Sequence, residues 1–327
     1  MIRAFSLALL ASLMLSGTAL AAPQVVASIK PIHALVAAVM EEVGEPILIV
    51  KGSASPHTYA LKPSDASALE AADIVFWTGP DMELFLGDAL GTLAPHANSV
   101  ELAETPGIHL LSPRESGAFE PHDHGEAGDH DHDEQEHDHD HDHEAAGHDH
   151  ADHHHAEETD PHFFLDPENA RLMVTHIAEV LAEADPENAA IYETNADAER
   201  VALDELEAEI RDSLAPVKDK PFIVFHDAYQ YFEQRFGLDV AGSITLSPEA
   251  MPGAARIDEL HAKVGELGAT CVFAEPNFRP AIVDTIIEGT AAKAGILDPE
   301  GSTLAEGPDL YAQLLRGLAT NLVDCLK

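Results

Sequence analysis

The chain has 327 residues, of which 45% are hydrophobic, so it is long enough to form two domains with sizeable cores. It carries 59 acidic against 17 basic residues, which gives a formal net charge of -42. A surface this acidic repels nucleic acid and anionic membranes and attracts cations.

The first residues, MIRAFSLALLASLMLSGTALAAPQ, predict a secretory signal peptide over residues 1–21. Arg3 precedes an apolar run that ends in Ala19-Leu20-Ala21, the small-residue pattern of a cleavage site. A membrane anchor is the alternative, but the run is short for one. No Cys lies near the cleavage site, and no later run reaches the ~18 apolar residues that span a bilayer. We therefore expect export to the periplasm without a lipid anchor.

After the signal peptide, short apolar runs alternate with helical segments. Strands are expected at 24–29, 46–50 and 73–78, and helices at 31–43 and about 65–72. Pro31 suits a first helical turn, and Ser64 and Asp65 are typical caps of the second helix. This β-α-β-α-β order predicts a parallel sheet with covering helices. We assign residues 22–186 to a first α/β lobe, which residues 115–160 interrupt.

Residues 115–160 form an insertion rich in His and Asp. They hold 18 of the 59 acidic residues, 13 of the 21 histidines and no Lys or Arg, so we expect a disordered loop without a packed core. The histidines are His122, His124, His130, His132, His137, His139, His141, His143, His148, His150, His153, His154 and His155. Each metal site in such a loop should be weak, but many weak sites raise the local metal concentration. A solubilising acidic insert is the alternative, although it does not account for the alternation of His with Asp.

Order is expected to resume at Pro161, and Asp166 followed by Pro167 is typical of a helix start. Residues 187–216 predict a long, mostly polar helix that links two lobes. Residues 217–327 repeat the β-α pattern and predict a second α/β lobe. Its strands are expected at 221–225, 239–244 and 270–274, and its helices at 228–236, 254–267, 280–294 and 308–325.

The chain has two cysteines, Cys271 and Cys325. In an oxidising compartment an isolated pair most often forms a disulfide. Two metal-binding thiolates are the alternative, but their spacing matches no common zinc module.

Three histidines stand out by their place in the predicted elements. His57 lies in the loop after strand 46–50, His226 directly follows strand 221–225, and His162 precedes the helix at Asp166. Ligands of open α/β sheets bind at the carboxyl ends of strands, and imidazole is the usual ligand of zinc. A single loop His is more often exposed to solvent than bound to metal. Convergence of all three in space is a hypothesis for the structure to test.

Five phrases of the sequence together resemble one known family, the zinc-uptake solute-binding proteins of bacterial ABC transporters. They are SIKPIHALVAAV, GSASPHTYALKPSDASALEAADIVFWTGPDME, HFFLDPENA, VFHDAYQYFEQRFGL and CVFAEPNFRPA. The resemblance implies two (β/α) lobes with parallel sheets, joined by a long rigid helix, with one Zn²⁺ in the cleft between the lobes. It matches His57, His162 and His226 to the three histidine ligands. It also implies the His/Asp-rich insertion and a disulfide between Cys271 and Cys325.

The chain departs from the family pattern at two places. Some zinc members have a carboxylate directly before the first His, where this chain has Pro56. Manganese members have Glu at the position of His226 and Asp where Asn277 falls in this chain. We therefore expect a water as the fourth zinc ligand, with Glu275 as the second choice. Three neutral imidazoles and one open position suit zinc better than manganese.

The resemblance implies a receptor that delivers Zn²⁺ to a membrane permease served by a separate ATPase subunit, and a periplasmic zinc chaperone is a further candidate partner. We expect a monomer. We also expect that the protein is not an enzyme, because the sequence has no HExxH, GxSxG or Walker A motif. Three histidines and a water are also a catalytic zinc geometry, so a zinc hydrolase is an alternative. A manganese or iron receptor of the same fold and a surface adhesion or buffering protein are further alternatives.

Overall fold

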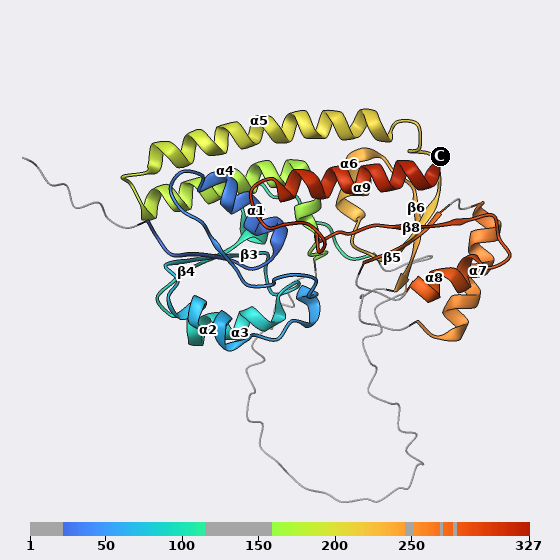
Figure 1. The fold of residues 1–327 in the computed structure, drawn as a ribbon, viewed down its shortest axis with the longest axis horizontal. Coiled ribbons are helices and arrows are strands. Elements are labelled where there is room, and N and C mark those ends of the chain that lie inside the picture. Colours follow the sequence, from blue (N-terminus) through green and yellow to red (C-terminus); the bar gives the residue numbers. More distant parts are fainter. Residues whose placement is uncertain (1–21, 115–158, 246–251, 269–270, 277–279) are drawn as a thin grey trace, which may run out of the picture.

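The structure, a computed structural model, describes residues 22–114, 159–245, 252–268, 271–276 and 280–327. It contains two four-stranded parallel sheets, with strand orders β2-β1-β3-β4 and β6-β5-β7-β8. Helices cover the sheets, and the two sheets lie in separate lobes (Figure 1). The predicted fold class, two α/β lobes with parallel sheets, is confirmed.

The first sheet is built from short buried runs. Its strands are β1 (Val25–Ala27), β2 (Ile47–Leu48), β3 (Ile74–Trp77) and β4 (Asn98–Glu101), and its nearby helices are α1 (Lys30–Val39), α2 (Pro63–Glu70) and α3 (Leu84–Leu93). All four residues of β3 are buried, as expected of a strand covered on both faces. Helix α2 begins at Pro63, before the predicted start. Asp65 is therefore not the first cap but the third helical residue, and its carboxylate accepts the N–H of Lys62 at 2.8 Å.

The second sheet follows the same plan. Its strands are β5 (Phe222–His226), β6 (Val240–Thr245), β7 (Cys271–Ala274) and β8 (Lys293–Ile296), and its helices are α6 (Gln230–Phe236), α7 (Ala254–Leu267) and α8 (Pro280–Ile287). The helix predicted for residues 280–294 was too long. It ends at Ile287, and Gly289 then adopts a left-handed φ of 74°, after which the chain returns as β8 beside β7.

The three longest helices of the described residues are α4 (Pro167–Ala184), α5 (Ala189–Leu214) and α9 (Leu310–Leu326). Helix α5 has 26 residues and packs on α4, α9, α1 and α6. Helix α9 packs on α1 of the first lobe and also on β8 of the second, so the C-terminal segment contacts both lobes (Figure 1). A buried lysine adds to this contact, because Lys30 Nζ donates to the carbonyls of Gly301, Ser302 and Leu304 at 2.8–3.2 Å.

A disulfide joins Cys271, the first residue of β7, to Cys325 near the end of α9, with a Cα–Cα distance of 6.1 Å. The structure thus has the disulfide rather than a pair of thiolates. The predicted signal peptide lies outside the described residues. Within the described part of the chain, no helix is long and apolar enough to cross a membrane.

Candidate metal-binding site

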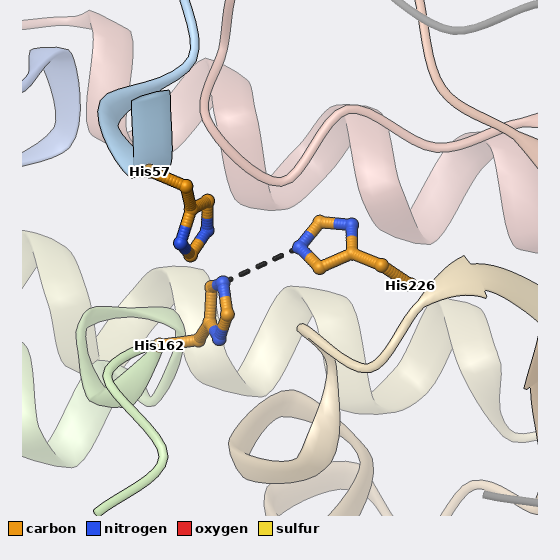
Figure 2. A group of neighbouring side chains, drawn as sticks. All are labelled: His57, His162 and His226. Carbon is orange, nitrogen blue, oxygen red and sulfur yellow. Dashed lines mark hydrogen bonds between the residues drawn. The ribbon is translucent and has the colours of Figure 1, made fainter. Parts of the chain in front are cut away.

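Three histidines from distant parts of the sequence meet in one place (Figure 2). One ring nitrogen of each lies within 4.8 Å of the other two. The ring centroids are 5.5 Å apart for His57 and His162, 5.9 Å for His57 and His226, and 5.2 Å for His162 and His226. In the part of the chain that the structure describes, this is the one group of three or more His, Cys, Asp or Glu side chains arranged to hold a metal ion.

Each histidine is placed by a short turn or a strand end. His57 lies in a 3₁₀ turn, η1 (Pro56–Thr58), in the loop after β2, and His226 is the last residue of β5. His162 directly precedes another 3₁₀ turn, η3 (Phe163–Leu165), whose three side chains are buried. Two of the three histidines therefore lie at or beyond the carboxyl ends of parallel strands, one in each lobe, where α/β sheets bind ligands.

His162 and His226 form a close pair. Their Nε2 atoms are 3.4 Å apart, along the dashed line in Figure 2. On the other side of each ring, Nδ1 contacts a carboxylate: Asp160 Oδ1 lies 2.8 Å from His162, and Glu275 Oε1 lies 2.5 Å from His226. The two rings and two carboxylates are 1–5% exposed. An Nδ1–H that donates to a carboxylate leaves the Nε2 lone pair free, which is how metal-binding histidines are usually held.

His57 completes the group in a different way. Its Nε2 atom is buried and has no hydrogen-bond partner among the described residues. Burial, together with the neighbouring rings of His162 and His226, holds the pKa of His57 well below its ordinary value of 6.5. The ring is therefore neutral near pH 7. A neutral imidazole with an unpaired buried nitrogen, beside two nitrogens that face each other, fits a cation bound between the three rings.

The carboxylates of Glu275 and Asp160 have positions that differ from those predicted from the sequence. Glu275, considered above as a fourth ligand, is outside the group of three and contacts the Nδ1 side of His226. Asp160, which the sequence analysis assigned to the insertion, contacts His162. The signal that could have marked it is its position two residues before a candidate ligand. Asn277 and the insertion's thirteen histidines, from His122 to His155, lie outside the described residues.

Two residues at the end of the predicted insertion, Thr159 and Asp160, contact the folded part of the chain. Thr159 Oγ1 donates to Asp81 Oδ2 at 2.7 Å, and the N–H of Asp160 donates to the carbonyl of Leu111 at 2.8 Å. Both residues belong to the folded part of the chain, and Asp160 is 4% exposed.

Comparisons with known proteins also connect this chain with zinc uptake. The family model described as "Zinc-uptake complex component A periplasmic" matches residues 25–325. The chain is 56% identical to the high-affinity zinc uptake system protein ZnuA of Brucella abortus, over 92% of this chain and 91% of that protein. It is 37% identical to the Yersinia pestis protein of the same name, over 94% and 92%.

A crystal structure of ZnuA shares the fold, with a TM-score of 0.72 and 23% identity over 94% of this chain and 100% of that one. The family model spans both lobes and all three clustered histidines. The chain belongs to the family of periplasmic zinc-uptake component A proteins, which are solute-binding proteins of ABC transporters.

Proposed function

We propose that this protein captures Zn²⁺ in the periplasm with His57, His162 and His226 and delivers it to the permease of an ABC importer. The observation that carries the proposal is the convergence of three imidazoles, two of them buried and held by carboxylates at Nδ1. The names of the relatives, which describe high-affinity zinc uptake, support the same ion.

The chemistry of the donors favours zinc over manganese or iron. The group offers three imidazole nitrogens, and no carboxylate belongs to it within the described residues. Zinc accepts such a set readily, whereas manganese prefers oxygen ligands. Because Glu275 is engaged with His226, a water is the better candidate for the fourth position.

The same carboxylates argue for a receptor rather than a zinc hydrolase. A hydrolase needs a general base within reach of the metal-bound water. Asp160 and Glu275 instead contact the Nδ1 atoms of two candidate ligands, where they orient the rings. ATP hydrolysis belongs to a separate subunit in this proposal, since the chain has no Walker A motif.

We assign the His/Asp-rich insertion the role of an accessory collector that binds zinc weakly and raises its concentration near the three histidines. The support is compositional, namely 13 histidines, many of which alternate with acidic residues. Export through a cleaved signal peptide at residues 1–21 is part of the same proposal.

A competition titration against a zinc chelator tests the proposal on three forms of the mature protein. These are the full chain, a chain that lacks residues 115–158, and that shorter chain with His226→Ala. The deletion keeps Thr159 and Asp160, because Asp160 contacts His162. His96→Ala is the control, since His96 is exposed and lies outside the group of three.

We expect one tight site that survives the deletion, disappears with His226→Ala and persists in His96→Ala. Weak additional sites should be lost with the insertion. If no tight site remained without the insertion, the three histidines would not be the receptor. Tighter binding of Mn²⁺ than of Zn²⁺ would favour the manganese alternative.

A further inference from the structure

We infer that Tyr231 of helix α6 is a positioning residue of the metal site, which assembles His162 with His226 before the ion arrives. The inference rests on the proposed metal-binding function and deepens it. It concerns the segment 160–166, which carries His162, and helix α6, which begins four residues after His226.

Tyr231 is connected to the candidate ligand His162 through one intervening residue, Asp160. Its hydroxyl donates to the carbonyl of Asp160 at 2.8 Å and accepts the N–H of Leu111 at 2.8 Å. Asp160 in turn holds Nδ1 of His162 through its carboxylate. The side chain of Tyr231 is 1% exposed, so water cannot readily replace these hydrogen bonds.

Other side chains of α6 support the same contact. Arg235 binds both carboxylate oxygens of Asp166 at 2.6 and 2.8 Å, and Gln230 Nε2 donates to the carbonyl of Ser112 at 3.1 Å. A charged contact lies beside them, because Arg114 pairs with Asp227 and Glu233. Helix α6 belongs to the second lobe, whereas segments 111–114 and 160–166 are continuous with the first. The helix thus fastens His162 to the lobe that carries His226.

The short Nε2–Nε2 distance of 3.4 Å follows from this arrangement. Both rings are attached to α6, His226 through the chain and His162 through Asp160 and Tyr231. Ligands held in place before binding lose less entropy when the ion arrives. Removal of the Tyr231 hydroxyl leaves the Asp160 carbonyl and the Leu111 N–H without that partner, so the ring of His162 should lose its fixed position.

The test is Tyr231→Phe in the full mature chain. Three quantities are measured: zinc affinity by chelator competition, the rate of zinc release to excess chelator, and the visible absorption of bound Co²⁺, which reports ligand geometry. Tyr192→Phe is the matched control, because Tyr192 is equally buried and its hydroxyl donates to Asp185 Oδ2 at 3.0 Å, on a helix that carries no candidate ligand.

We expect about tenfold faster zinc release and a changed Co²⁺ spectrum in Tyr231→Phe, because outer partners of ligands contribute about 10–100-fold to metal affinity. Tyr192→Phe should lower stability without these changes. In a double-mutant cycle, Tyr231→Phe and Asp160→Asn should lose less together than the sum of their separate losses, because they act through one ring.

Two results would overturn the inference. One is a zinc-release rate and a Co²⁺ spectrum in Tyr231→Phe that equal those of the wild type. The other is a loss of zinc affinity in Tyr192→Phe as large as that in Tyr231→Phe. Either result leaves the proposed function standing if the wild-type chain binds zinc and His226→Ala does not. Failure of the wild-type chain to bind zinc would instead refute the proposed function itself.

Discussion

The two sides of the candidate metal site are built differently. On one side, His162 and His226 each have a buried carboxylate at Nδ1, and their Nε2 atoms face each other. On the other side, His57 stands on a single 3₁₀ turn, and its Nε2 has no partner among the described residues. In the proposed function, the first side is held in place before a cation binds, whereas the ring of His57 would be fixed by the ion itself.

If the three histidines bind Zn²⁺ as proposed, this difference would let the receptor combine affinity with release. A pair of ligands held by carboxylates and by α6 loses little freedom on binding, so it supplies affinity. A ligand on a short turn without such a partner can leave the ion at lower cost. We therefore expect substitution of His162 or His226 to weaken zinc binding more than substitution of His57.

The largest effect should come from removal of a paired ligand. His162→Ala and His226→Ala should each weaken zinc binding by about 100-fold or more, since a quarter of a typical four-ligand zinc binding energy is about 3 kcal/mol. His57→Ala should weaken binding less. Chelator competition on all three variants measures the order, and an equal or greater loss in His57→Ala would contradict the comparison.

Loss of a supporting carboxylate should rank second. Glu275→Ala should weaken zinc binding by about 10–100-fold, because the ring of His226 loses the acceptor at Nδ1. Glu275→Gln should lose less, since an amide oxygen still accepts that hydrogen bond. Glu266→Gln, at an exposed position of α7, serves as the control. Wild-type zinc affinity in Glu275→Ala would show that the Glu275 carboxylate does not help His226 to bind zinc.

A pH-dependent effect should mark the His57 side. The folded pKa of His57 is well below 6.5, so below about that pH the unfolded chain takes up a proton that the folded metal-free chain does not. This contribution makes stability fall as the pH drops from 6.5 toward the folded pKa, and leaves it unchanged above 6.5. Thermal unfolding of the metal-free chain should show a smaller fall with acid in His57→Asn than in wild type. An identical fall in both chains would remove His57 as its source.

The smallest effect on zinc should come from the disulfide. Cys271→Ser with Cys325→Ser should lower the free energy of unfolding by up to about 4 kcal/mol, from the entropy of closing a 54-residue separation. Zinc affinity should change less than tenfold, because Cys271 lies at the opposite end of β7 from Glu275. Denaturant unfolding and chelator competition on the same sample separate the two effects. A larger loss of affinity would mean that β7 needs the disulfide to position Glu275.

Much of the fold could be predicted because its determinants are local. Short apolar runs between helical segments indicated two parallel sheets, and α6 ends at Phe236, the end predicted from the sequence. The errors have local causes as well. A hydrogen bond from the Lys62 N–H to Asp65 stabilises the start of α2 at Pro63, and a left-handed Gly289 follows the early end of α8. Helix α9 packs against both lobes, which no local pattern indicates, because that contact depends on how distant elements meet.

The amino-acid sequence was enough to identify imidazoles near the ends of strands and turns, two cysteines that could pair, and a segment, residues 115–160, rich in His and Asp. The folded structure was needed to show that His57, His162 and His226 meet. It was also needed to show that Asp160 and Glu275 contact Nδ1 of two of the rings. The reason is physical. A ligand's residue type and strand position are properties of a short stretch, whereas the partner of its second nitrogen is chosen by the packing of segments 49 residues apart, as for His226 and Glu275.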